Sequence, residues 1–154
     1  MKKGICLILT ALCLLGLTAC GETVQVTPDM QQVYDAMKDQ LPAMEIFPAE
    51  VVLDAYGIES ADCKQMVVSS YYDGADTAEI WLIEATDAAA AEEILELVQM
   101  RLTSLTDQFR NYDAAAYQLV KDAEPIIHGN CIALIVAEEA EDLIRIYKDA
   151  AQLK

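Results

Sequence analysis

The segment that most constrains the fold is the long amphipathic stretch at residues 88–109. Its apolar side chains recur every three or four residues, so they would form one continuous stripe along a helix: Ala91, Ile94, Leu95, Val98, Leu102, Leu105 and Phe109. The charged residues Glu92, Glu93, Glu96 and Arg101 fall mostly off the stripe, and Thr86-Asp87 supplies an N-cap. A stripe of this length needs an apolar partner, which we expect to be a sheet.

Two pairs of strands flank this helix in the sequence. Residues 64–72 and 78–84 are rich in β-branched and aromatic side chains, and the turn residues Asp73-Gly74-Ala75-Asp76 separate them. Residues 125–128 and 131–136 form a second pair around Gly129-Asn130. The run 131–136 is almost wholly apolar, which predicts a central strand covered on at least one face. The sequence therefore predicts two hairpins.

Four further helices are expected. The first spans 28–41, with Thr27 as N-cap and Pro28 at the first helical position, and the second spans 49–56, with Gly57 as a left-handed C-cap. The others span 114–121 and 139–152. Together with the hairpins they predict an α+β two-layer sandwich, in which a four-stranded, largely antiparallel sheet carries its long helices on one face. Residues 28–154 would form this single domain, with the strand order left open.

The N-terminal segment has the features of an export signal. Lys2 and Lys3 precede an apolar run at residues 5–17, which is shorter than the roughly 20 residues that span a bilayer. Leu17-Thr18-Ala19-Cys20 follows and resembles the bacterial lipobox, which implies cleavage before Cys20 and a lipid on its thiol. An ordinary secretory signal and a short transmembrane anchor are the alternatives.

This interpretation predicts a signal peptide at residues 1–19 and a lipidated cysteine with a short tether at 20–27. The residues between Cys20 and the first helix reach only about 25 Å when extended, at roughly 3.3 to 3.6 Å per residue. The domain would then lie on the extracytoplasmic face of the cell membrane. We expect any protein or small-molecule partner to be close to the membrane.

The charge of the chain argues against nucleic acid as a partner. The chain has 10 basic and 26 acidic residues, and removing the signal takes away two lysines and no acid. Eight basic residues then face 26 acidic ones, a net charge of about −18. Binding to phosphate backbones or anionic lipids requires clusters of Lys and Arg.

Cysteine and histidine usage gives no sign of a metal site or cofactor. Only Cys63 and Cys131 lie in the folded part, no CxxC motif occurs, and the single His128 cannot complete a zinc site of usual spacing. An exported domain permits a disulfide, but sequence alone does not give the distance between the two thiols. We expect them to be unpaired, because Cys131 fits an apolar strand as a small hydrophobic residue.

Few other residues suggest a site. Tyr71, Tyr72 and Trp81 are a candidate recognition surface on the first hairpin. Asp73 and Asp76 lack the ligand pattern of an EF-hand, so a solvated turn is preferred to a calcium site. His128 is expected to be a turn or edge residue rather than a general base. The acidic cluster at positions 138, 139, 141 and 142 is explained by a helix N-terminus.

Several short motifs run through the mature chain: Ala55-Tyr56-Gly57-Ile58, Ala78-Glu79-Ile80, Phe109-Arg110-Asn111-Tyr112, Ala116-Tyr117-Gln118-Leu119-Val120 and His128-Gly129-Asn130-Cys131. With the lipobox, they make the chain resemble the uncharacterised bacterial lipoproteins of the domain-of-unknown-function 4358 family. That resemblance carries over no activity and no catalytic residues.

The sequence thus predicts a lipid-anchored accessory or binding domain without catalysis of its own. The alternative is an enzyme that acts on cell-envelope material through acidic residues. A pocket holding a carboxylate with a strongly raised pKa would favour the enzyme. A flat, exposed apolar sheet face would favour binding to a partner.

Overall fold

The computed structural model of the chain describes residues 26–72 and 77–153. The helices are α1 (Met30–Met37), α2 (Ala49–Tyr56), α3 (Ala88–Phe109), α4 (Ala114–Asp122) and α5 (Ala140–Ala150), with 3₁₀ turns at Lys38–Gln40 and Ser60–Asp62. The strands are β1 (Glu45–Phe47), β2 (Cys63–Tyr71), β3 (Ala78–Ala85), β4 (Ile126–His128) and β5 (Cys131–Val136). The α+β class expected from the sequence is confirmed.

The strands form one open antiparallel sheet in the order β1-β2-β3-β5-β4. Its central strand is β3, in which Trp81 lies opposite Val68 of β2 and Leu134 of β5. All eight residues of β3 are buried. A strand with neighbours on both edges and helices on both faces has no side open to water.

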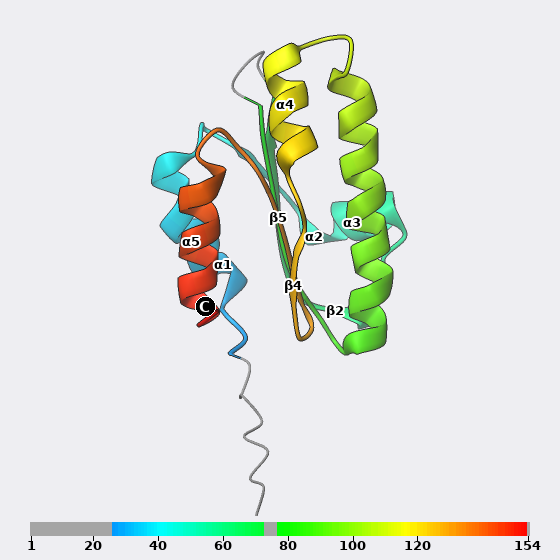
Figure 1. Cartoon of the computed structure of the whole chain (residues 1–154). Coiled ribbons are helices and arrows are strands. Elements are labelled where there is room, and N and C mark those ends of the chain that lie inside the picture. The colour runs from blue at the N-terminus through cyan, green and yellow to red at the C-terminus, as the bar shows by residue number, and fades with distance from the viewer. Residues whose placement is uncertain (1–25, 73–76, 154) are drawn as a thin grey trace, which may run out of the picture.

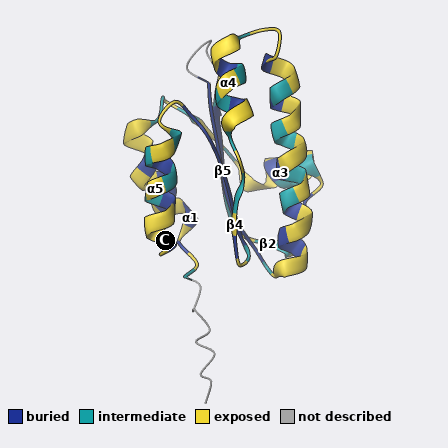
Figure 2. Ribbon diagram, viewed as in Figure 1, coloured by how far each residue is buried: buried dark blue, intermediate teal, exposed yellow. Residues whose placement is uncertain are grey.

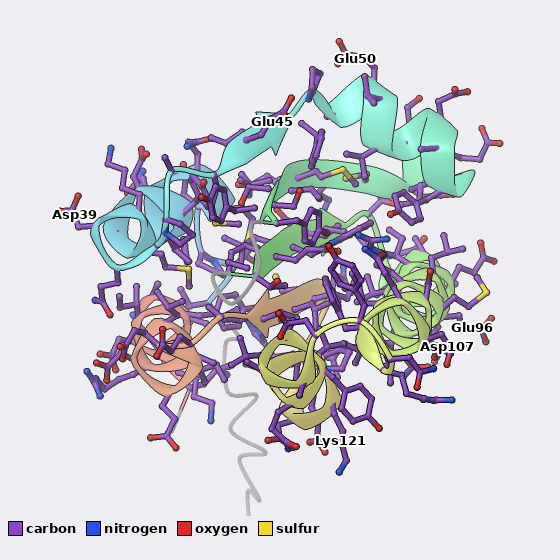
Figure 3. The ribbon with its side chains drawn as sticks, turned by 90° about the horizontal axis from the view of Figure 1, so that it is seen from above. Asp39, Glu45, Glu50, Glu96, Asp107 and Lys121 are labelled. Carbon is purple, nitrogen blue, oxygen red and sulfur yellow. The ribbon has the colours of Figure 1, made fainter. Side chains whose placement is uncertain are left out.

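Helices cover both faces of the sheet, so the molecule has three layers (Figures 1 and 3). On one face α2, α3 and α4 enclose a core with alternate residues of β3 and β5, among them Trp81, Ile83 and Leu134. On the other face α1 and α5 pack on the intervening residues, among them Ile80, Leu82 and Ala133. The two cores are visible in Figure 2 as buried positions on both sides of the sheet.

The expected two-layer arrangement, with the helices on one face, is therefore wrong. The physical reason lies in β3 and β5, where the residues at both odd and even positions are apolar. Such strands need cover on both faces. The short helices α1 and α5 supply the second cover, each through one buried stripe that includes Val33 and Met37 in α1 and Leu143 and Tyr147 in α5.

The sheet has five strands rather than the expected four, because β1 was not foreseen. It is three residues long and precedes Pro48, so no period-2 pattern could reveal it. Its residue Ile46 pairs with Ser69 at the edge of β2. The remaining strands, 63–71, 78–85, 126–128 and 131–136, agree with the expected ones to within one residue.

The helix bounds agree closely with the sequence analysis, except for α1. Helices 49–56 and 88–109 match at both ends, and Asp87 caps α3 by accepting a hydrogen bond from the Ala90 N–H at 2.9 Å. The α-helical part of α1 is shorter than the expected 28–41. Asp29 rather than Thr27 is its N-cap and accepts from the Gln32 N–H at 2.9 Å.

The two cysteines of the folded part are free, as expected. Cys63 in β2 pairs with Ala85, while Cys131 in β5 pairs with Glu84, so strand β3 lies between them. Cys63 packs on the α3 side of the sheet and Cys131 on the α5 side. Neighbouring strands lie about 4.8 Å apart, so thiols two strands apart on opposite faces are beyond bonding distance.

None of the helices within residues 26–72 and 77–153 is long and apolar enough to cross a membrane. The predicted signal, Cys20 and most of the tether lie outside the described residues, as do Asp73 and Asp76 of the first hairpin turn.

Candidate functional site

The structure has a pocket of about 210 Å³ on the α3 side of the sheet, where α2 and α3 flank strands β1, β2 and β3. Most of its lining is apolar or aromatic. The lining residues are Phe47, Val51, Val52, Ala55, Tyr56, Val68, Ser70, Tyr72, Glu79, Trp81 and Arg101.

Strand geometry explains how the floor of the pocket is assembled. Successive side chains of a strand point to opposite faces, so Glu79 and Trp81 share the face toward α3. In the antiparallel register Ser70 lies opposite Glu79, and Val68 lies opposite Trp81. These four positions therefore form one contiguous patch of two neighbouring strands.

Helix α3 contributes Arg101, the charged partner of Glu79. Arg101 lies three residues after Val98 and four before Leu105, both of which are buried against the sheet. Its side chain consequently starts on the sheet-facing side of the helix, and only 21% of it is exposed. The guanidinium reaches Glu79, whose side chain is 2% exposed.

Four donors surround the carboxylate of Glu79. Oε1 accepts from Trp81 Nε1 at 2.6 Å and from Arg101 Nε at 2.8 Å. Oε2 accepts from Arg101 Nη2 at 2.7 Å and from the Tyr72 hydroxyl. Arg101 Nη2 also donates to the Tyr72 oxygen at 2.6 Å. The arrangement is a bidentate ion pair, a geometry that is stronger and more directional than a single charged hydrogen bond.

The ionisation of the neighbouring groups reflects this pair. Burial raises the pKa of Tyr72, and the charge of Glu79 and its hydrogen bond raise it further. Burial opposes the charged form of Arg101, but the hydrogen bonds and charge of Glu79 outweigh it and raise the pKa of the guanidinium. Arg101 therefore stays charged and Tyr72 stays a protonated donor.

Aromatic rings form much of the pocket wall. Tyr56 of α2 stands edge-on to Trp81, with ring centroids 4.8 Å apart and an interplanar angle of 84°. Tyr72 tilts against Phe109 of α3 at 6.2 Å. The chain has only ten aromatic residues of the Phe, Trp and Tyr types, and four of them, including Phe47, line this one pocket. That concentration favours a flat or ring-shaped occupant.

The structure brings together two of the three aromatic residues proposed as a recognition surface. Tyr72 and Trp81 meet in the pocket, but Trp81 is 1% exposed and forms its floor rather than an outer surface. Tyr71 pairs with Ala78, which packs on the α1 and α5 side. Tyr71 therefore lies on the other face of the sheet.

Sequence analysis missed Glu79, Arg101 and Tyr56 as site residues. Glu79 was one available signal, because it is the only charged residue in the stretch 78–83 of the expected strand 78–84, and a charge at such a position requires a partner. Another was Arg101, spaced on the helix like the core residues Val98 and Leu105. The sequence could not show that the two side chains meet.

His128 ends the edge strand β4, as expected for a turn or edge residue. Its Nδ1 lies 3.1 Å from the Tyr147 hydroxyl, and its Nε2 lies 3.4 Å from the backbone oxygen of Val26. Burial raises the pKa of Tyr147. These contacts fasten the start of the domain to the β4–β5 hairpin and leave His128 away from the pocket.

The acidic cluster lies at the start of α5, as expected, with Glu139 as N-cap and Glu141 and Asp142 in the first turn. It borders an open groove of about 740 Å³ beside α4, β4 and β5, which Asp122 and Glu124 also line. Within the described residues, no group of three or more His, Cys, Asp or Glu side chains is placed to hold a metal ion.

Comparison with known proteins assigns the chain to one family. No curated protein and no solved structure matches the chain. The family model described as "Domain of unknown function (DUF4358)" matches residues 38–137, a range that contains every residue lining the pocket. Because this match covers well over half of the sequence, the chain belongs to the DUF4358 family.

Proposed function

We propose that the protein is a lipid-anchored, extracytoplasmic binding domain that holds a small molecule in the pocket between α2 and α3 and performs no catalysis on it. The observation that carries the proposal is the pocket itself, in which mostly apolar walls surround a few convergent polar groups. Small-molecule sites in proteins commonly have this composition.

Its charged group argues for binding rather than catalysis. A carboxylate has about four lone-pair sites, and the four donors around Glu79 occupy them. A general base must have a lone pair free to take a proton from its substrate. Glu79 offers none, which weakens the alternative of an enzyme acting through the acidic residue of this pocket.

The sheet offers no flat surface for a protein partner, because helices cover both of its faces. The pocket instead opens on the α2 and α3 side. Val26, the first described residue, contacts His128 on the α1 and α5 side. An anchor attached at Cys20 would thus enter the domain on the face away from the pocket, leaving the pocket accessible.

A variant that fills the pocket tests the proposal. Ala55 is exposed at the rim, so Ala55→Phe should occupy the pocket without disturbing the core. Ala36→Phe is the matched control, because Ala36 is also an exposed helical alanine but belongs to α1 on the opposite face. The full-length proteins are isolated from their native membranes, and the small molecules they carry are identified by mass spectrometry.

We expect one small molecule to accompany the unaltered protein and the Ala36→Phe variant, and to be lost from Ala55→Phe. Identical extracts from all three proteins would contradict a pocket-based function. If the unaltered protein and Ala36→Phe carried both a small molecule and a reaction product of it, and Ala55→Phe carried neither, the result would favour the enzyme.

A further inference from the structure

Two hydrogen-bond donors at the pocket are unused within the described residues. In Arg101, Nε donates to Glu79, and Nη2 donates to Glu79 and Tyr72. Its Nη1 group has no hydrogen bond to a described residue. The Tyr56 hydroxyl likewise makes no hydrogen bond within the part of the chain that the structure describes. Both side chains line the pocket.

The Tyr56 hydroxyl belongs to the same pocket as the ion pair and remains a donor. Burial raises the pKa of Tyr56, Arg101 lowers it and Glu79 raises it, with a net increase. Tyr56 lines the same pocket as Glu79 and Arg101, and both charges act on its hydroxyl. The other polar groups of the pocket are already engaged. The Tyr72 hydroxyl donates to Glu79 and accepts from Arg101, and the Ser70 side chain is hydrogen-bonded to Tyr72. An occupant therefore meets free donors and needs an acceptor.

The local charge balance selects an uncharged occupant. Glu79 and Arg101 cancel each other, so the pocket is neutral within a chain of net charge −16. A bound anion or cation would bring an uncompensated charge into mostly apolar surroundings, which is costly. A cation would also face the guanidinium, and an anion would face the negative potential of the whole molecule.

Size and shape restrict the occupant further. A sealed apolar cavity of about 150 Å³ holds one benzene molecule. The present volume of about 210 Å³ accommodates a single ring with a short substituent. The rings of Phe47, Tyr56, Tyr72 and Trp81 offer the faces and edges on which such a ring packs.

We infer that the ligand is a small, uncharged, single-ring molecule whose carbonyl-type oxygen accepts hydrogen bonds from the Tyr56 hydroxyl and from Arg101 Nη1. This inference rests on the proposed pocket function and adds the chemical class of the ligand. Tyr56 is then the residue that selects the acceptor, and it belongs to α2, the shorter of the two helices that flank the pocket.

The single tryptophan of the chain reports occupancy directly, because Trp81 forms the pocket floor. The full-length protein in detergent micelles is titrated with three probes of one ring each: acetophenone, which is neutral with a carbonyl, benzoate, which is an anion, and benzylamine, which is a cation at neutral pH. Trp81 fluorescence is followed in each titration, with empty micelles as the blank. We expect acetophenone to bind most tightly.

Tyr56→Phe tests the acceptor contact, since it removes the hydroxyl and keeps the ring that packs on Trp81. It should weaken acetophenone binding by about 3- to 10-fold, the value of one hydrogen bond. Tyr112→Phe is the matched control, because Tyr112 is 82% exposed and does not line the pocket. It should leave the affinity unchanged. All proteins are measured in the same detergent, so partitioning of the probe into micelles affects their apparent affinities equally.

The outcomes separate the two proposals. Tighter binding of benzoate or benzylamine, or equal affinity of Tyr56→Phe for acetophenone, overturns the ligand class while leaving a binding pocket. Absence of binding by all three probes overturns this inference and, together with unchanged extracts from Ala55→Phe, the pocket function as well.

Discussion

At the scale of single residues, the ion pair of Glu79 and Arg101 determines the character of the site. Burying two charges is expensive, and their attraction offsets the cost only when good geometry and further hydrogen bonds satisfy the remaining atoms. Trp81 and Tyr72 supply those hydrogen bonds. The result is a neutral, rigid floor under apolar walls, which suits the retention of a ligand better than the transfer of protons.

Breaking the pair from one side should be severely destabilising. Arg101→Leu would leave the Glu79 carboxylate buried without a counter-charge, and we expect the free energy of unfolding to fall by about 3–5 kcal/mol. Urea unfolding of the full-length protein in micelles, followed by Trp81 fluorescence, gives this value. The double variant Glu79→Leu with Arg101→Leu removes both charges and should recover part of the loss. A double variant as unstable as Arg101→Leu alone would contradict this account of the pair.

Individual site residues were only partly predictable. Tyr72 and Trp81 were expected in an aromatic recognition surface on the first hairpin, and the structure places both at the pocket. Glu79 in β3 and Arg101 in α3 are 22 positions apart in the sequence. The residue pattern of neither element indicates that the two side chains meet. Their meeting depends on how α3 lies across the sheet, which is set by packing rather than by local pattern.

At the scale of elements, α2 depends on its C-terminal glycine. Gly57 has φ 66° and ψ 30°, in the left-handed region, and its N–H closes the helix on the carbonyls of Leu53 and Asp54. An added Cβ would meet no atom within 4 Å. Substitution there is therefore strained by backbone conformation and not by steric contact.

Gly57→Ala should lower the free energy of unfolding by about 1–2 kcal/mol, the cost of holding a residue with a Cβ in that conformation. Gly57→Asn should cost less, because Asn tolerates the left-handed region. Chemical unfolding of the full-length protein measures both. Equal stability of Gly57→Ala and the unaltered protein would show that the helix end rearranges at no cost. Since Tyr56 immediately precedes Gly57, weaker acetophenone binding in the alanine variant would show that the cap also positions the ligand contact.

Long periodic elements were predictable and short ones were not. The bounds of α3 and β5 could be predicted from the sequence, because the apolar stripe of α3 and the apolar run of β5 are long enough to be recognised. Strand β1 has three residues and forms only because the edge of β2 is available to pair with it. The sequences of α1 and α5 show an apolar stripe but do not indicate which face of the sheet it packs on. The distribution of helices over both faces therefore depends on the assembled sheet.

At the scale of the whole molecule, most acidic side chains lie on the surface, and Arg101 neutralises the buried Glu79 of the pocket. The labelled acids point outward: Glu96 and Asp107 from α3, and Asp39, Glu45 and Glu50 from three other elements (Figure 3). Such a surface repels anionic lipid head groups. Electrostatic attraction would thus not hold the domain at a membrane, and attachment would depend on the covalent lipid that the sequence predicts at Cys20.

This dependence makes Cys20 the residue whose loss should detach the protein. Cys20→Ser removes the thiol that would carry the lipid, so we expect it to abolish fatty-acid labelling in cells and to leave the uncleaved precursor. Cys13→Ser is the matched control, because Cys13 lies within the apolar run of the expected signal and leaves Leu17-Thr18-Ala19-Cys20 intact. It should be labelled and processed normally. Labelling of Cys20→Ser at the level of the unaltered protein would refute lipidation at this position. Cleavage without labelling in both the unaltered protein and Cys13→Ser would instead indicate an ordinary secretory signal and a domain released from the membrane.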